Sequence, residues 1–110
     1  MCTKQKHKIQ YNDNGLMVDQ IEYNNRLFIF KKNVRCSIQQ IELDCICIEL
    51  GDFTWHLFTD DIVYAKEFLC KFVNGILDNI ASFEDESLSN ENRLAKKRFW
   101  KIIEYIQEGY

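Results

Sequence analysis

The chain has 110 residues, near the commonest size of a single domain, so we expect one domain over residues 1–110 with one hydrophobic core. Hydrophobic residues make up 46% of the chain and aromatic residues 14%, which excludes a disordered protein, because burying this much apolar surface can offset the loss of conformational entropy. The formal net charge of −3 disfavours nonspecific nucleic-acid binding, and no stretch approaches the roughly 20 apolar residues that span a bilayer.

The first predicted element is a β-hairpin. Two apolar-rich segments, residues 16–23 and 26–31, are separated by Asn24 and Asn25, and asparagine tolerates the positive φ values that a two-residue hairpin turn requires. In the second segment both sets of alternating side chains are apolar, which places that strand near the middle of a sheet.

Residues 34–43 fit either a strand or a helix. Alternate residues at its start are apolar, but apolar side chains also recur at helical intervals of three and four. We favour a strand, because a bulge at Gln39-Gln40 would continue the alternation from Ile41 to Cys47.

A second hairpin and two helices complete the predicted fold. A hydroxyl followed by two carboxylates suits the N-terminus of a helix, so we expect the first helix to begin at Thr59-Asp60-Asp61. The remaining elements are a tight turn at Gly51-Asp52, a strand over 53–58, an apolar helix face from Ile62 to Ile80, a polar loop over 82–92, and a last helix capped by Ser89 or Asn90 whose apolar face includes Phe99 and continues through Ile106 toward Tyr110. This order predicts an α+β fold: an antiparallel sheet of about four to five strands, followed by two C-terminal helices packed on one face.

The stretch from Cys45 to His56 contains the residue types of a reactive or metal-binding site. Cys45 and Cys47 are two apart on a strand, without the paired spacing of structural zinc ligands, and lie among isoleucines, so we interpret them as core thiols. A Cys–His catalytic pair would need a thiol with a lowered pKa, whereas the surrounding carboxylates would raise that pKa. We therefore expect no catalysis, no metal site and no cofactor, and an enzyme using His56 with a cysteine stays a minor alternative.

Cysteine usage and the N-terminal residues predict a cytoplasmic location. The five cysteines are odd in number and irregularly spaced, which favours free thiols in a reducing compartment. The sequence Met1-Cys2-Thr3-Lys4 lacks the apolar segment of a secretory signal.

Charge is unevenly distributed along the chain. Residues 1–40 carry seven basic and three acidic side chains, residues 41–92 carry two and twelve, and residues 93–110 carry five and two, which gives +4, −10 and +3. A polarised surface of this kind attracts an oppositely charged partner. The alternative is mutual neutralisation, with the basic last helix folded against the acidic loop.

We therefore expect a small non-catalytic protein-binding domain, most concretely an immunity protein or inhibitor that neutralises a basic toxin or nuclease. The predicted partner-binding residues are acidic and fall in two segments: Glu42, Asp44, Glu49, Asp52, Asp60 and Asp61, and then Glu84, Asp85 and Glu86.

Two alternatives remain open. A homodimer or a small-ligand site could use an apolar sheet face left uncovered by the helices, with Phe28, Phe30, Trp55 and Phe58 as contributing side chains. The basic cluster over residues 93–101 could contact nucleic acid, but cations opposite a buried helix face usually form a solvated surface, and the acidic balance of the chain makes nucleic acid an unexpected partner.

Overall fold

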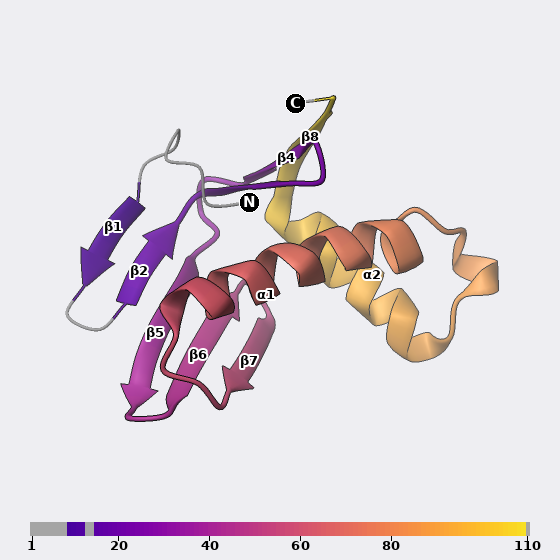
Figure 1. Cartoon of the computed structure of the whole chain (residues 1–110). Helices are drawn as coiled ribbons and strands as arrows, with labels where there is room; N and C mark the ends of the chain where they lie inside the picture. Colours follow the sequence, from indigo (N-terminus) through magenta and orange to yellow (C-terminus); the bar gives the residue numbers. More distant parts are fainter. Residues whose placement is uncertain (1–8, 13–14, 110) are drawn as a thin grey trace.

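A computed structural model describes residues 9–12 and 15–109 of the chain, and these form two antiparallel sheets and two α-helices (Figure 1). The large sheet has the strand order β1-β2-β5-β6-β7, formed by β1 (Ile9–Asn12), β2 (Gly15–Val18), β5 (Cys36–Glu42), β6 (Cys45–Leu50) and β7 (Phe53–Leu57). The small sheet has the order β3-β4-β8, formed by β3 (Gln20–Tyr23), β4 (Arg26–Phe30) and β8 (Ile103–Glu108). The helices are α1 (Ile62–Ile76), which continues into a π-helical segment (Leu77–Ala81), and α2 (Asn90–Ile102), preceded by a 3-10 turn (Asp85–Ser87).

The predicted α+β class is confirmed, with helices packed against a sheet face. The strands divide between two sheets because β4 pairs with β3 on one side and with the C-terminal β8 on the other, and none of the three pairs with the large sheet. Within the described residues no helix is both long enough and apolar enough to cross a membrane.

The C-terminal end of the chain differs from the prediction. The last helix stops at Ile102, and Ile103 already has the extended angles φ −95° and ψ 125°. The following residues form β8, where Ile106 pairs with Phe28 of β4. The apolar spacing of this segment fits a helix as well as a strand, and pairing with β4 overrides the local helical pattern because it completes the small sheet.

Two tight turns set the strand registers. Asn24 and Asn25 have φ values of 56° and 60°, which confirms the predicted two-residue hairpin turn with positive φ at both positions. Gly51 has φ 58° at the first central position of the β6–β7 turn, a conformation that favours glycine.

Residues 34–43 are resolved in favour of the strand. β5 begins at Cys36, and its register against β6 shifts between Gln40 and Glu42, so the bulge lies close to the predicted position. The bulge does not carry the apolar alternation forward as expected, because Ile41 is 48% exposed and Leu43 is 80% exposed. The buried residues of β6 are instead Ile46, Ile48 and Leu50.

The core lies between the large sheet and α1, with α2 closing one end (Figure 1). The first helix starts at Ile62 and is capped by Asp61, whose side chain accepts hydrogen bonds from the backbone N–H groups of Val63 and Tyr64 at 3.0 and 3.2 Å. Ser89 caps α2 by accepting from the N–H of Asn92 at 3.2 Å. Ser89 is one of the two predicted caps of α2, whereas α1 starts at Ile62, directly after the predicted segment 59–61, and is capped by Asp61 instead of the Thr59 hydroxyl.

Candidate functional site

Four of the predicted acidic residues meet at one end of the large sheet. Ile46 pairs with Leu57, so the β5–β6 turn and the loop that follows β7 lie next to each other beyond this pair. In Figure 1 both connections lie at the lower end of the sheet, beside the start of α1. We call residues 41–44 and 58–61 the acidic tip; its carboxylates are Glu42, Asp44, Asp60 and Asp61.

The acidic tip also exposes large apolar side chains. Phe58 is 91% exposed and Leu43 80%, and both lie among the four carboxylates. Among the described residues no cation forms an ion pair with any of these carboxylates. An exposed aromatic and an exposed aliphatic anchor, surrounded by charge, is the arrangement found at protein interfaces, where buried anchors carry most of the binding energy and charged residues form the rim.

Asp61 has a structural role as well, because it caps α1. Removing a cap of this type costs about 1 kcal/mol of stability. Glu49 and Asp52 lie away from the tip. Glu49 is the penultimate residue of β6. Asp52 occupies the β6–β7 turn at the opposite end of the sheet from the tip, where its Oδ2 is 3.6 Å from Lys101 Nζ.

The second predicted acidic segment, Glu84, Asp85 and Glu86, is separate from the tip. It follows the C-terminal end of the α1 and π-helical segments, whereas the tip is at the start of α1 (Figure 1). At 1.5 Å per residue the intervening helix holds the two about 30 Å apart. We call residues 84–86 the acidic loop.

Two cations from α2 contact the acidic loop, and both contacts are at Asp85. Lys96 Nζ lies 2.9 Å from Asp85 Oδ1 and also donates to the Phe83 carbonyl at 2.6 Å. Arg93 Nε donates to the Asp85 carbonyl at 2.8 Å. The hydrogen bond and the charge of Lys96 lower the pKa of Asp85. The sequence left open whether the basic last helix neutralises the acidic segments. It does so at Asp85 of the loop, and no described cation does so at the tip.

The same contacts engage part of the basic cluster on α2. Lys96 and Arg93 are directed at the acidic loop, and Phe99 is fully buried, as predicted. Trp100 is 42% exposed, and its indole Nε1 donates to the Ala81 carbonyl at 3.4 Å. With Lys101, which pairs with Asp52, three of the five cations of this helix therefore already contact acceptors within the chain.

The interpretation of Cys45 and Cys47 as core thiols is wrong. Both are half-buried, because Ile46, Ile48 and Leu50 turn toward α1 and the two cysteines take the opposite face of β6. The buried free thiol is Cys36, and burial raises its pKa to about 12.

Cys47 lies directly across from His56, which the sequence could not show. Burial, Glu49 and Cys45 raise the pKa of Cys47, as its acidic surroundings predict. A raised pKa reduces the thiolate fraction, which is the opposite of what a nucleophile needs. Within residues 9–12 and 15–109 no group of three or more His, Cys, Asp or Glu residues is arranged to hold a metal ion.

Cys70, which is buried on α1, is not a free thiol, so the cysteines as a set do not test the expected reducing compartment.

The strands β2, β5, β6 and β7 of the large sheet do not present the expected apolar face. Phe28 and Phe30 are buried, and Trp55 packs against Phe68 and Phe72 of α1, so only Phe58 is exposed as expected. The face turned away from α1 carries a mixed set that is mostly polar: Met17, Ser37, Gln39, Cys47, Glu49, Thr54 and His56.

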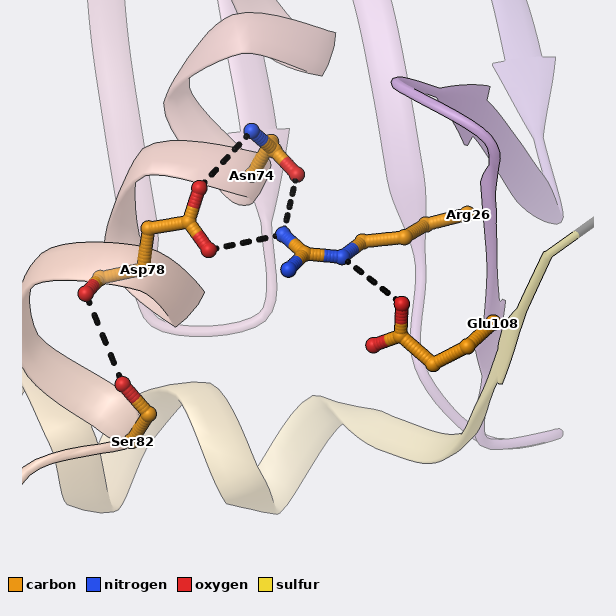
Figure 2. A network of polar contacts seen from close by, with 5 residues as sticks. All are labelled: Arg26, Asn74, Asp78, Ser82 and Glu108. Carbon is orange, nitrogen blue, oxygen red and sulfur yellow. Dashed lines mark hydrogen bonds and ion pairs between the residues drawn. The ribbon is translucent and has the colours of Figure 1, made fainter.

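An ionic junction between the two halves of the fold was not foreseen (Figure 2). Arg26 Nη1, on β4, donates at 2.8 Å to Asn74 Oδ1 and at 2.8 Å to Asp78 Oδ1. Arg26 Nε donates to Glu108 of β8 at 3.1 Å. The hydrogen bond to Asp78 is the main cause that raises the pKa of Arg26. The only sequence signal was an arginine within an apolar strand, together with a polar Asn74-x-x-x-Asp78 pair one helical turn apart.

No family model, curated protein or solved structure matches this chain.

Proposed function

We propose that the protein is a non-catalytic protein-binding domain, most concretely an immunity protein or inhibitor that neutralises a basic toxin or nuclease in the cytoplasm. The observation that carries the proposal is the acidic tip. It combines four carboxylates that are unpaired among the described residues with two exposed apolar anchors, Leu43 and Phe58.

The chemistry of the tip matches a cationic site. A nuclease holds phosphate groups with arginine and lysine side chains, and carboxylates can occupy the same positions because they form the same charge-assisted hydrogen bonds. Complementary charge would speed association, and Leu43 and Phe58 would supply the buried apolar contacts that slow dissociation.

The structure refines which carboxylates should be tested. Asp61 caps α1 and Asp52 pairs with Lys101, so changing either would alter the fold as well as the surface. Glu42, Asp44 and Asp60 are exposed and hold neither role.

The experiment is affinity purification with two matched variants. Tagged wild-type protein is compared with a tip variant, Glu42→Lys with Asp44→Lys and Asp60→Lys, and with a loop variant, Glu84→Lys with Glu86→Lys, at low and high salt. A basic nuclease or toxin domain retained by the wild type is then purified, and its affinity and inhibition are measured. We expect the tip variant to weaken binding by about a hundredfold or more at low salt, with a smaller difference at high salt, because salt screens exposed charges.

The loop variant serves as the control, since it reverses two charges without touching the tip. We expect it to bind the partner almost as wild type does. The proposal would be wrong if both variants lost the same affinity for the partner, or if the partner bound the tip variant as tightly as the wild type. A Phe58→Ala variant distinguishes the apolar contribution to binding from the contribution of the carboxylates. It should raise the dissociation rate of the complex and leave the salt dependence of binding unchanged.

A further inference from the structure

A basic groove with an aromatic wall lies between α2 and the acidic loop. We call it the α2 groove. It has a volume of about 480 Å³ and is lined by Asp85, Arg93, Leu94, Lys96, Lys97 and Trp100. The lining contains three cations and one carboxylate, so the groove is locally positive in a chain whose net charge is −3.

The cations of the groove repel one another along the helix. Arg93 lies three residues before Lys96 and four before Lys97, and like charges at these spacings destabilise a helix. Asp85 relieves part of this repulsion, because its Oδ1 is 2.9 Å from Lys96 Nζ. Lys97 is exposed and forms no ion pair among the described residues. A further carboxylate beside Arg93 and Lys97 would therefore be stabilising.

The groove also exposes apolar surface. Trp100 is 42% exposed and Leu94 47%. The indole of Trp100 is held in place, because its Nε1 donates to the Ala81 carbonyl at 3.4 Å and its ring meets Phe99 edge-on at 5.0 Å between ring centroids. An aromatic ring that is already ordered loses little conformational entropy when a partner covers it, which makes Trp100 a suitable anchor.

The contacts of α2 with the acidic loop show how this helix holds an acidic segment. Lys96 binds the carboxylate of Asp85 and the main-chain carbonyl of Phe83, and Arg93 binds the main-chain carbonyl of Asp85. The same face of α2 thus binds both side-chain and main-chain oxygens. Beside Lys97 and Trp100 it offers the same chemistry to a second acidic segment.

We propose that the α2 groove binds the acidic tip of a second copy of this chain. The tip offers four carboxylates that are unpaired among the described residues, together with the exposed side chains of Leu43 and Phe58. In this contact the carboxylates approach Arg93 and Lys97, and the apolar side chains of the tip cover Trp100.

The tip cannot reach the groove of its own chain. The tip lies at the start of α1, whereas the groove adjoins Ala81 at the end of the π-helical segment, and at 1.5 Å per residue about 30 Å of helix separates them. Figure 1 shows the tip at the lower end of the large sheet and the start of α2 at the far right. The contact therefore joins different surfaces of two copies, and it either repeats from copy to copy or closes into a ring.

The composition of the groove favours this occupant over other anions. A nucleic-acid strand could stack on Trp100, but its phosphates would meet Asp85 and the negative charge of the chain. An inorganic anion could pair with Lys97, but it would leave Trp100 and Leu94 exposed. The tip supplies both carboxylates and apolar groups, and it is present wherever the groove is present.

The first measurement is sedimentation equilibrium of the pure full chain over a wide concentration range. We expect the mass to rise above 13.2 kDa with concentration, and to rise less at high salt. The tip variant defined above and a groove variant, Leu94→Gln with Lys97→Glu, should each weaken self-association by about tenfold or more. Glu49→Lys and Lys32→Glu reverse charges outside both surfaces, so these controls should associate as wild type does.

A mixture of the two variants tests whether the contact joins different surfaces. The groove variant keeps an intact tip and the tip variant keeps an intact groove. The mixture should therefore form a pair of twice 13.2 kDa at concentrations where each variant alone stays at 13.2 kDa, which also shows that both variants are folded. In the NMR spectrum of the labelled tip variant, the indole N–H signal of Trp100 should shift when the unlabelled groove variant is added, and that of Trp55 should not.

Two results would overturn the proposal: a mass of 13.2 kDa for the wild type at every concentration, or a mixture of the variants that forms no pair. Because the tip is also the surface proposed to bind a basic partner, that partner should return self-associated wild type to single copies, each bound to one partner. This last expectation rests on the proposed function, whereas the mass and the mixture are measured without any partner. The two proposals can therefore fail separately.

Discussion

The acidic tip and the acidic loop have similar compositions and opposite environments. Each is a short connection dense in carboxylates, but the loop faces Lys96 and Arg93 of α2, whereas the tip faces no cation among the described residues. The difference shows that acidic composition alone does not define a binding surface. A surface is available for a partner only where the fold brings no cation of its own.

Arg26 is the partner of two further acidic residues of the chain. Asp78 and Glu108 are acidic residues that the fold satisfies with one guanidinium, which is itself only 21% exposed at its side chain. Asn74, the third acceptor, is 8% exposed. Among the described residues, carboxylates are thus paired at Arg26 and at Asp85 of the loop, and unpaired at the tip.

The largest effect on stability is expected at Arg26. Arg26→Ala removes donors from Asn74, Asp78 and Glu108 at once, and the mostly buried Asn74 oxygen loses its charged partner. We expect a loss of about 2 to 3 kcal/mol in the free energy of unfolding, because an unsatisfied buried acceptor retains its desolvation cost. Urea denaturation measures this loss: the midpoint urea concentration should fall while the slope of the free energy of unfolding against urea stays constant.

Arg26→Lys is the matched control for charge. A lysine keeps the positive charge but cannot direct two nitrogens at acceptors on opposite sides, so we expect it to recover only part of the loss. If Arg26→Ala unfolded at the same urea concentration as wild type, the contacts of Arg26 with Asn74, Asp78 and Glu108 would contribute nothing to stability.

Local patterns in the sequence were sufficient for the turns and helix starts. Asn24-Asn25, Gly51 and the Asp61 cap depend on φ preferences or on a side chain that bonds a nearby N–H, and these act over a few residues. β8 could not be predicted in the same way, because its strand conformation depends on pairing with β4, more than seventy residues earlier.

The candidate site was predictable in composition but not in arrangement. The sequence identifies all the acidic residues, but only the strand order shows that Asp44 and Asp60 adjoin while Asp85 lies beyond the far end of α1. Shifting a strand by one residue moves each of its side chains to the other face of the sheet. The face that Cys45 and Cys47 occupy therefore depends on the register of β6 against β5, which the bulge before Glu42 sets.

A smaller effect, of opposite sign in the two regions, is expected from neutralising carboxylates. Glu42→Gln with Asp44→Asn should raise the free energy of unfolding by about 0.5 kcal/mol, because the change relieves repulsion among unpaired like charges. Asp85→Asn should lower it slightly, because it removes the partner of Lys96. Both differences should shrink at high salt, and urea denaturation at two salt concentrations measures them. A loss of stability in the tip variant would mean that its carboxylates have a structural partner after all.

The smallest effect concerns the pH dependence of the acidic loop. Lys96 lowers the pKa of Asp85 in the folded protein, so folding is favoured by the ionised carboxylate. That contribution is complete above the pKa of the unfolded chain, about 3.9 for aspartate, and is lost as pH falls through the lower folded value. The difference in free energy of unfolding between wild type and Asp85→Asn should therefore be present at neutral pH and vanish in acid. A difference that persisted unchanged in acid, below the folded pKa of Asp85, would show that it arises from packing and not from the Lys96 ion pair.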